Sequence, residues 1–332
     1  MKSKDIGIDL GTSNILIYVK GEGVVLSEPS VVALDKNTKK VIAIGREAYK
    51  MLGRTPGSVV VNKPLKDGVI ANFDETEIML EYFIKKIRCK TIFTKPRILI
   101  CCPSNITQVE KNAIKEVAER TGAKSVYVEE EPKVAAVGAG LEINIPSGNM
   151  VIDIGGGTTD IAVMSLGDVV YSESIKIAGN TFDNDIIDYI KNKHKLLIGD
   201  VTAEQIKINI GTLEEKPKEK SIKIRGRDII TGLPKTIEIT SLEIKESLKN
   251  SINVIIHKVK NVLEKIEPEL SADIIEKGII ITGGGALIKG LDKCIEKEIK
   301  VPVRIATKPL TCVVEGTGII LENKKSIIIY FF

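Results

Sequence analysis

The sequence is poor in the residues on which most side-chain catalysis depends. Its 332 residues include two histidines and no tryptophan, and aromatic residues make up 4%. Neither His194 nor His257 has a serine or cysteine nearby in a recognisable nucleophile context. Catalysis by a histidine-based triad is therefore not expected, and both histidines are interpreted as surface residues.

Three further deficits narrow the class of protein. No stretch reaches the roughly 18 apolar residues of a membrane span, and the start "MKSKDIGIDL" has no apolar signal region. The net charge of +4 is small and dispersed, so no nucleic-acid partner is expected. The five cysteines form no metal-type spacing, and this scattered, odd set indicates a reducing cytosol. They are Cys89, Cys101, Cys102, Cys294 and Cys312.

The chain contains one short pattern twice. "IGIDLGTSNILIYV" begins at Ile6, and "VIDIGGGTTDIAVM" begins at Val151. Both read as an apolar strand with an aspartate, a glycine turn with hydroxyl residues, and a second apolar strand. Asp9 and Asp153 are 153 − 9 = 144 residues apart, about one domain. The repeat predicts two similar α/β domains that face each other across a cleft, with the boundary at the turn 146–148.

The two glycine turns together favour phosphate binding. Glycine lets backbone N–H groups approach an anion closely, and Thr12, Ser13, Thr158 and Thr159 add hydroxyl donors. The P-loop lysine is missing from both turns. One such turn alone is equally compatible with a plain hairpin, whereas two matched turns can clamp a triphosphate from opposite sides.

Carboxylates at the strand ends predict a magnesium site. Asp9 and Asp153 would hold Mg²⁺ beside the phosphates, largely through water, and Asp160 is a further candidate. In "VEEEP", the turn before Pro132 fixes Glu131 most rigidly, so its carboxylate is the candidate for positioning an attacking water. Glu129 and Glu130 are expected to be solvated or paired instead.

Two other segments are candidates for contacts with the nucleoside. The turn Ile281–Gly290 is expected to follow a strand and open a helix, a common place for a nucleotide sugar or phosphate. A tight structural turn is the alternative. Glu204 and Lys207 are three apart on a predicted helix and share a face, so they can grip a ribose or form a plain exposed ion pair.

Two helix starts are also predicted from local signals. A helix over Thr76–Ile87 is expected with a threonine as its cap, and a long helix is expected to start at Ser241.

These motifs in this order resemble the bacterial actin MreB/Mbl family, within the superfamily of actins, heat-shock chaperones and sugar kinases. The resemblance spans about residues 5 to 320 and includes both glycine turns, "EEPKVAAVGAGL", "TAEQIKINIG", "ITGGGALIKGLD" and "PLTCVVEGTG". The lysine- and isoleucine-rich composition is similar to that of proteins from wall-less bacteria such as the spiroplasmas, which carry several MreB copies.

The resemblance implies an actin-like ATPase fold of four subdomains around a nucleotide cleft. Domain I would cover residues 1–147 with a small subdomain at about 31–74, and domain II would cover 148–320 with one at about 182–242. A tail with an apolar end would follow at 321–332. Six apolar residues, 327–332, are too few to span a bilayer; membrane insertion, core packing and protein contacts are equally open to them.

The resemblance also implies ATP or ADP with Mg²⁺ as ligands and assigns roles by motif match. Glu131 falls on the water-activating glutamate, with Thr159 as a partner for that water and Asp160 beside it. The remaining residues would bind the nucleotide: Asp9, Thr12, Ser13 and Asn14 in the first phosphate loop, Gly155, Gly156, Gly157 and Thr158 in the second, and Glu204, Gln205, Ile206, Lys207, Gly284, Gly285 and Ala286 around adenosine.

Three positions depart from the family pattern. Asp160 stands where glutamate is usual, which puts the hydrolysis rate in doubt. Lys133 replaces an apolar residue and adds a cation near Glu131. Asn72 stands where aspartate is common.

The family also implies contact with the inner membrane face. The N-terminal amphipathic helix used by some members is missing, because strand pattern begins by Asp5. Ile92 and Phe93 in "KTIFTKP" are the alternative, with flanking lysines for anionic headgroups and a loop packed on its own domain as the competing interpretation.

The sequence therefore predicts a slow cytoskeletal ATPase that forms head-to-tail filaments at the inner face of the cell membrane and serves cell shape or motility. Its expected partners are further copies of itself, the membrane and paralogous MreB proteins. Two alternatives remain: a filament modulator that binds nucleotide but hydrolyses little, and a small-molecule kinase of the same fold. A chaperone-type ATPase would need a long peptide-binding region after the core, which this chain does not show.

Overall fold

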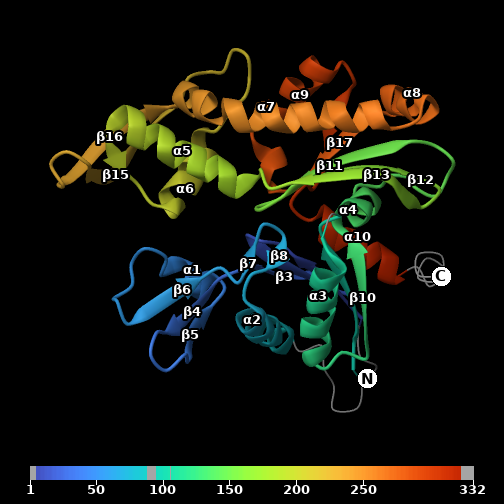
Figure 1. The fold of residues 1–332 in the computed structure, drawn as a ribbon, viewed down its shortest axis with the longest axis horizontal. Coiled ribbons are helices and arrows are strands. Elements are labelled where there is room, and N and C mark those ends of the chain that lie inside the picture. Colours follow the sequence, from blue (N-terminus) through green and yellow to red (C-terminus); the bar gives the residue numbers. More distant parts are fainter. Residues whose placement is uncertain (1–4, 88–94, 105, 323–332) are drawn as a thin grey trace.

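The computed structural model describes residues 5–87, 95–104 and 106–322. Two five-stranded sheets dominate it, one from each half of the chain (Figure 1). The first sheet has the order β10-β9-β1-β2-β3. Its strands are β1 (Ile6–Leu10), β2 (Asn14–Val19), β3 (Gly23–Pro29), β9 (Arg97–Cys102) and β10 (Ser125–Glu130).

The second sheet repeats this plan in the order β13-β12-β11-β17-β18. Its strands are β11 (Asn149–Ile154), β12 (Thr159–Ser165), β13 (Asp168–Ile175), β17 (Ile279–Thr282) and β18 (Val303–Ile305). In both sheets an antiparallel three-strand meander is extended by two parallel strands on the side of its first strand. The duplication expected from the two glycine turns is thus present in the topology.

Each half also carries a small three-stranded sheet. In the first half, β4 (Val32–Asp35) pairs with β5 (Val41–Ile44) and β6 (Val59–Asn62), followed in the chain by the ribbon of β7 (Leu65–Lys66) and β8 (Val69–Ile70). In the second half, β15 (Ser221–Asp228) and β16 (Pro234–Thr240) form a hairpin, and β14 (Leu196–Leu197) pairs with β15. The exact domain and subdomain limits stay predictions.

Helices cover the sheets and connect them. The first half contains α1 (Arg46–Lys50), α2 (Phe73–Lys86), α3 (Gln108–Arg120) and α4 (Glu131–Gly138). The second half contains α5 (Gly179–His194), α6 (Asp200–Ile210), α7 (Ser241–Lys265), α8 (Pro268–Lys277), the 3₁₀ turn η1 (Gly284–Leu287), α9 (Leu291–Ile299) and α10 (Cys312–Glu322).

Helices α4 and α10 lie between the two large sheets (Figure 1). They pack against each other, α10 also contacts β1 and β2, and α4 contacts β11 and β12. Close approach of the two helices requires Gly138 and Gly316, because a Cβ at either position would overlap the backbone of the other helix. A hydrophobic cluster drawn from both halves fills this layer, including Leu99, Val134 and Val151.

One predicted helix start is wrong, and a second helix starts as predicted but has a different cap. Helix α2 begins three residues before Thr76, and the Asn72 side chain caps it by accepting from Glu75 N at 3.1 Å. Thr76 lies inside the helix and donates its hydroxyl to Asn72 O at 2.6 Å. Helix α7 starts at Ser241 as predicted, and its cap is Thr240, in a capping box with Glu243. In both cases a neighbouring Asn or Thr competes for the cap, and sequence alone does not separate two such candidates.

The third glycine turn also differs from expectation. After β17 the chain forms η1, and α9 begins only at Leu291. Gly283 and Gly290 have φ of 81° and 76°, so the chain turns sharply before and after η1. None of the helices in the part of the chain that the structure describes is long and apolar enough to cross a membrane.

Candidate functional site

The two glycine turns meet in the structure. One joins β1 to β2 and the other joins β11 to β12, so each stands at the same place in its sheet. A Cβ built on Gly156 would overlap the Ser13 side chain, and one on Gly157 would lie 2.6 Å from the Thr12 hydroxyl oxygen. Only glycine fits at these two positions of the second turn. The turns therefore face each other from the two halves of the chain.

The first turn is held by hydrogen bonds to its own half. The Thr12 hydroxyl accepts from Gly68 N at 2.9 Å, and the Ser30 hydroxyl donates to Gly11 O at 2.6 Å. Thr12 is buried, Ser13 is partly buried and Asn14 is exposed at the start of β2. Backbone and hydroxyl donors are thus fixed before any ligand arrives, which is the preorganisation that phosphate binding requires.

The second turn is held by hydrogen bonds from the start of α5. Gly155 N donates to Thr158 O at 2.9 Å and closes the turn. Gly179 N and Asn180 N donate to the carbonyls of Gly155 and Gly156 at 3.1 and 2.8 Å. These bonds couple the turn to the N-terminal end of a 16-residue helix.

Asn180 also connects the two halves, and sequence reasoning missed it. The Ser13 hydroxyl donates to Asn180 Oδ1 at 3.4 Å, across 167 residues of chain. Asn180 lies in the first turn of α5, which begins at Gly179. The signal was present: "AGN" is separated from the end of β13 by two residues and opens a helix, which is where backbone donors gather.

Four carboxylates cluster beside the turns. Asp9 lies in β1, Asp153 in β11 and Asp160 opposite Asp153 in the β11–β12 pair, and Glu131 opens α4. Burial raises the pKa of Asp9 to about 7 and that of Asp153 to about 6, and the charge of Asp153 adds to the effect on Asp9. Mutual repulsion in a poorly solvated space disfavours full ionisation of this group.

Glu131 is the most perturbed of the four. Burial raises its pKa well above the usual range, and the charges of Asp160, Asp9 and Asp153 raise it further. Its neighbours are paired instead, as the sequence analysis allowed: Glu129 lies 3.3 Å from Lys133 Nζ, and Glu130 lies 3.4 Å from Lys111 Nζ. A buried carboxyl among like charges is the environment in which a proton-accepting group is tuned.

Asp160 is buried, and a backbone N–H group donates a hydrogen bond to one of its two carboxylate oxygens. Its Oδ1 accepts from Ser104 N at 3.1 Å, and its pKa is raised by burial although nearby donors lower it. Within residues 5–87, 95–104 and 106–322, no hydrogen bond reaches Asp160 Oδ2. Ser104 belongs to the first half, so this bond is a second link between the halves.

Two hydroxyls near the cluster are already engaged. Thr159 is fully buried and donates to Ile177 O at 2.6 Å, so its hydroxyl proton is not directed at the carboxylates. The Thr282 hydroxyl donates to Asp153 Oδ1 at 2.7 Å and lowers the pKa of that carboxyl against the effect of burial. Thr282 was not among the predicted residues.

The segment of α6 that was predicted to contact the nucleoside, 204–207, has polar residues near or at the surface and one residue in the core. Lys207 bonds to Asp183 at 2.8 Å and donates to Gly179 O at 2.8 Å, so it stands beside the start of α5. Glu204 accepts from the Tyr49 hydroxyl, a contact between α6 and α1 of the first half. Gln205 is exposed, and Ile206 is buried in the core of the second half. Ile206 therefore offers only its backbone to a ligand.

The turn after β17 lies against the C-terminal end of β11. Gly284 is exposed, whereas Gly285 and Ala286 are buried. A Cβ on Gly283 would lie 2.8 Å from Asp153 Oδ1, so this turn and the carboxylate cluster are adjacent. The predicted membrane residues Ile92 and Phe93 and the apolar end 327–332 lie outside the described residues. The ligand roles of all these residues stay predictions.

Comparison with known proteins identifies relatives across nearly the whole chain. The family model for the MreB/Mbl protein matches residues 3–329. The cell shape-determining protein Mbl of Bacillus cereus is 62% identical over 323 residues, covering 97% of both chains. The cell shape-determining protein MreB of Escherichia coli is 47% identical, covering 97% of this chain and 94% of its own.

A solved structure resembles the fold at full length. The crystal structure of MreB5 of Spiroplasma citri bound to AMPPNP superposes with a TM-score of 0.95 at 44% sequence identity, with all of both chains covered. The actin-like α/β fold with two duplicated domains is therefore established for this chain.

Proposed function

Because the chain belongs to the MreB/Mbl protein family, we propose that it is a cytoskeletal actin-like ATPase that binds ATP between its two glycine turns and hydrolyses it slowly. One observation carries the proposal: turns 144 residues apart in sequence meet at Ser13 and Gly156, beside four clustered carboxylates. A triphosphate between the turns would touch both halves, so binding would also set their relative orientation. The structure of a relative bound to AMPPNP supports nucleotide binding by this fold.

Asp9 and Asp153 offer two carboxylates to a divalent cation, although among the described residues no three His, Cys, Asp or Glu side chains are placed to hold a metal ion by themselves. Asp9 and Asp153 are poorly solvated carboxyls with raised pKa values, and Asp160 has a buried oxygen that makes no hydrogen bond within the described residues. Asp9 and Asp153 would hold Mg²⁺, largely through water, because hard carboxylate oxygens are its preferred protein ligands. When bound, the cation supplies positive charge that neutralises the phosphates.

In this proposal the protein contributes position and one proton acceptor. Backbone N–H groups of both turns orient the phosphates, and Glu131 orients a water at the start of α4. Neither turn carries a lysine, and no arginine finger is evident in the sequence. Catalysis would rest on a few fixed dipoles, so a slow rate is expected.

Filament formation is the second half of the proposal. Head-to-tail contacts between identical subunits do not close into rings and therefore propagate. The chain would act at the inner face of the cell membrane, with further copies of itself and paralogous family members as partners. Ile92 and Phe93 are proposed to reach the membrane. Cell shape is the process that the names of the relatives support.

A filament modulator with little hydrolysis is the second candidate, and Asp160 favours it. One Asp160 oxygen is taken by Ser104 N, so this short side chain has little freedom to act on a ligand. Phosphate release with ATP and Mg²⁺, measured beside electron microscopy of the polymer, separates the candidates. Polymer with measurable release supports the ATPase, polymer without release supports the modulator, and absence of nucleotide binding contradicts both. Phosphate release without any added acceptor would exclude the kinase.

A further inference from the structure

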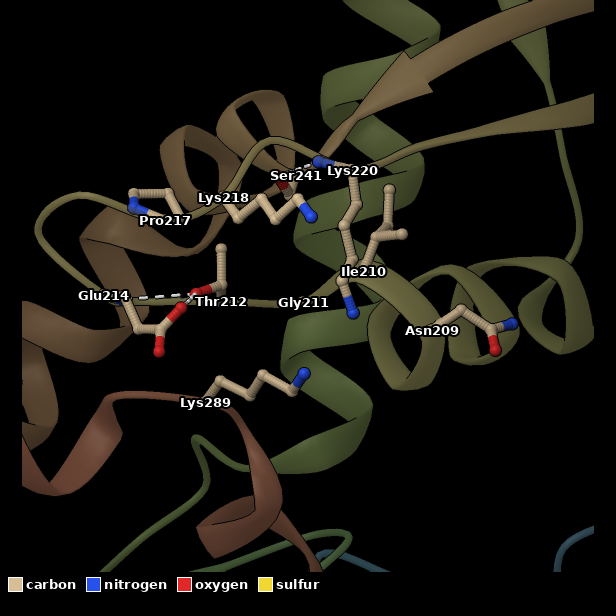
Figure 2. A pocket seen from close by; sticks show the side chains of 10 residues that line it. All are labelled: Asn209, Ile210, Gly211, Thr212, Glu214, Pro217, Lys218, Lys220, Ser241 and Lys289. Carbon is tan, nitrogen blue, oxygen red and sulfur yellow. Dashed lines mark hydrogen bonds between the residues drawn. The ribbon is translucent and has the colours of Figure 1, made fainter.

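A pocket of about 130 Å³ lies at the C-terminal end of α6, outside the residues expected to hold the nucleotide. Its wall is formed by that helix end, the segment that follows it, the first residue of α7 and Lys289 after η1 (Figure 2). Neither the segment 204–207 nor the turn 284–286 lines it. The pocket is therefore a compartment of its own beside the nucleotide-binding elements.

Three lysines converge on this pocket. Figure 2 shows the side chains of Lys218 and Lys220, from the segment after α6, and of Lys289, from the segment after η1, reaching into the same space. Contact with Lys289 lowers the pKa of Lys220, and the charge of Lys218 adds to this effect. Long exposed side chains can fan apart into water, so their gathering in one place is a specific feature of this wall.

The backbone fixes the origin of two of these side chains. Leu213 N donates to Lys289 O at 2.7 Å, which ties the segment after α6 to the segment after η1. Lys220 N donates to the Ser241 hydroxyl at 3.1 Å, and Ser241 N donates back to Lys220 O at 2.8 Å. The pocket is thus framed by elements that do not depend on a ligand for their position.

The positive charge of the wall is not balanced by the protein. Within the described ranges, none of the three lysines forms an ion pair. Glu214 is the one carboxylate among the lining residues, so three positive charges and one negative charge leave 3 − 1 = +2. Like charges held together repel, and a bound anion converts that repulsion into attraction.

We propose that this pocket binds a phosphate group. Lysine ammoniums act as point charges that suit a tetrahedral dianion approached from several sides, whereas planar carboxylate recognition favours the arginine fork, and no arginine lines this pocket. The Ser241 hydroxyl lies in the same wall and accepts from Lys220 N, so its own proton can supply a neutral hydrogen bond. The group belongs either to a free phosphorylated molecule or to a phospholipid headgroup.

The test uses the full chain with the proposed nucleotide site saturated by AMPPNP and Mg²⁺, so that added phosphate does not enter between the glycine turns. Inorganic phosphate is titrated and its ³¹P linewidth is followed. The double variant Lys220→Gln/Lys289→Gln is compared with Lys216→Gln/Lys249→Gln, which removes the same charge from two exposed lysines outside the pocket.

We expect broadening of the phosphate signal with wild type and the control, and a loss of affinity of about tenfold or more in the pocket variant. A second arm floats the same proteins with vesicles of phosphatidylcholine containing phosphatidic acid. Free phosphate binding that depends on the pocket lysines assigns a soluble ligand, and vesicle binding alone with that dependence assigns a headgroup. Equal behaviour of the two variants in both arms, or no binding in either, overturns the proposal.

Discussion

Gly156 and Ser13 pack so closely that a Cβ on Gly156 would overlap the Ser13 side chain. Gly156→Ala should therefore push the two turns apart and weaken ATP binding by about tenfold or more, because the donors of each turn would no longer face the same phosphates. Isothermal titration with AMPPNP and Mg²⁺ measures the effect. Gly57→Ala is the control, since a Cβ there meets nothing within 4 Å. Unchanged affinity in Gly156→Ala would contradict a site between the turns.

Glu131→Gln should preserve the fold and nucleotide binding while phosphate release falls by about 100-fold or more. The amide keeps the size of the side chain but cannot accept a proton from water. Since Glu131 is buried among like charges, removing its charge should also make the nucleotide-free protein no less stable. Release assays with polymer checked by light scattering test this, and full turnover in the variant would refute the assigned role.

Stability of the nucleotide-free protein should decrease as pH rises from about 4 towards about 7. Burial raises the pKa of Asp9 from 3.8 to about 7, so in this window the folded state binds a proton that the unfolded state has released. The unfolded state then binds fewer protons, and the free energy of unfolding falls with pH. Asp153, with a pKa raised to about 6, contributes in the same direction.

Asp9→Asn should flatten this pH dependence and raise the melting temperature by about 2–5 °C at about pH 8. Urea unfolding or thermal melts at several pH values, without nucleotide or Mg²⁺, provide the measurement. Lys133 and Lys111 are the positive charges that pair with Glu129 and Glu130 beside the cluster, and both are retained in this variant. A slope as steep as that of the wild type would show that Asp9 does not carry the effect.

The sequence predicts the fold well where a pattern is repeated and poorly where two residues compete locally. The matched turns at Asp9 and Asp153 reveal the duplication, because identical strand–turn–strand plans require identical sheets. The cap of α2 was misplaced because Asn72 and Thr76 are both good capping residues.

Some contacts within the candidate site could not be predicted from the sequence either. Contacts such as Ser13–Asn180 and Ser104–Asp160 join residues 167 and 56 positions apart, and no local periodicity encodes them. Ile206 was assigned to the nucleotide site by motif match alone, and the motif did not indicate that its side chain packs in the core, where one apolar helix face holds α6 in place.

Tyr49→Phe should speed nucleotide release by about tenfold. The Tyr49 hydroxyl donates to Glu204 and joins α1 of the first half to α6 of the second, and burial together with this bond raises the pKa of Tyr49. A hydrogen bond to a charged group contributes about 1.5–3 kcal/mol, and its loss should weaken the contact between α1 and α6. Stopped-flow release of a fluorescent ATP analogue measures the rate. Tyr82→Phe, on an exposed tyrosine, should leave it unchanged.

Lys133→Met should destabilise the protein although it restores the apolar residue usual in the family. Lys133 is 7% exposed and lies 3.3 Å from the buried Glu129 carboxylate, whose pKa burial raises and Lys133 lowers. Removing the lysine leaves a buried carboxylate without its cation, a loss of about 3–5 kcal/mol in comparable pairs.

The double variant Lys133→Met/Glu129→Gln should recover most of that stability, because neither residue then brings a charge into the buried space. Urea unfolding of the wild type, both single variants and the double variant closes the cycle. The single variant Lys133→Met should also lose stability more steeply as pH rises, since its unpaired Glu129 resists ionisation in the folded state. If the lysine can be removed at no cost, or if the double variant is no better than the single, the pair of Lys133 and Glu129 does not stabilise the start of α4.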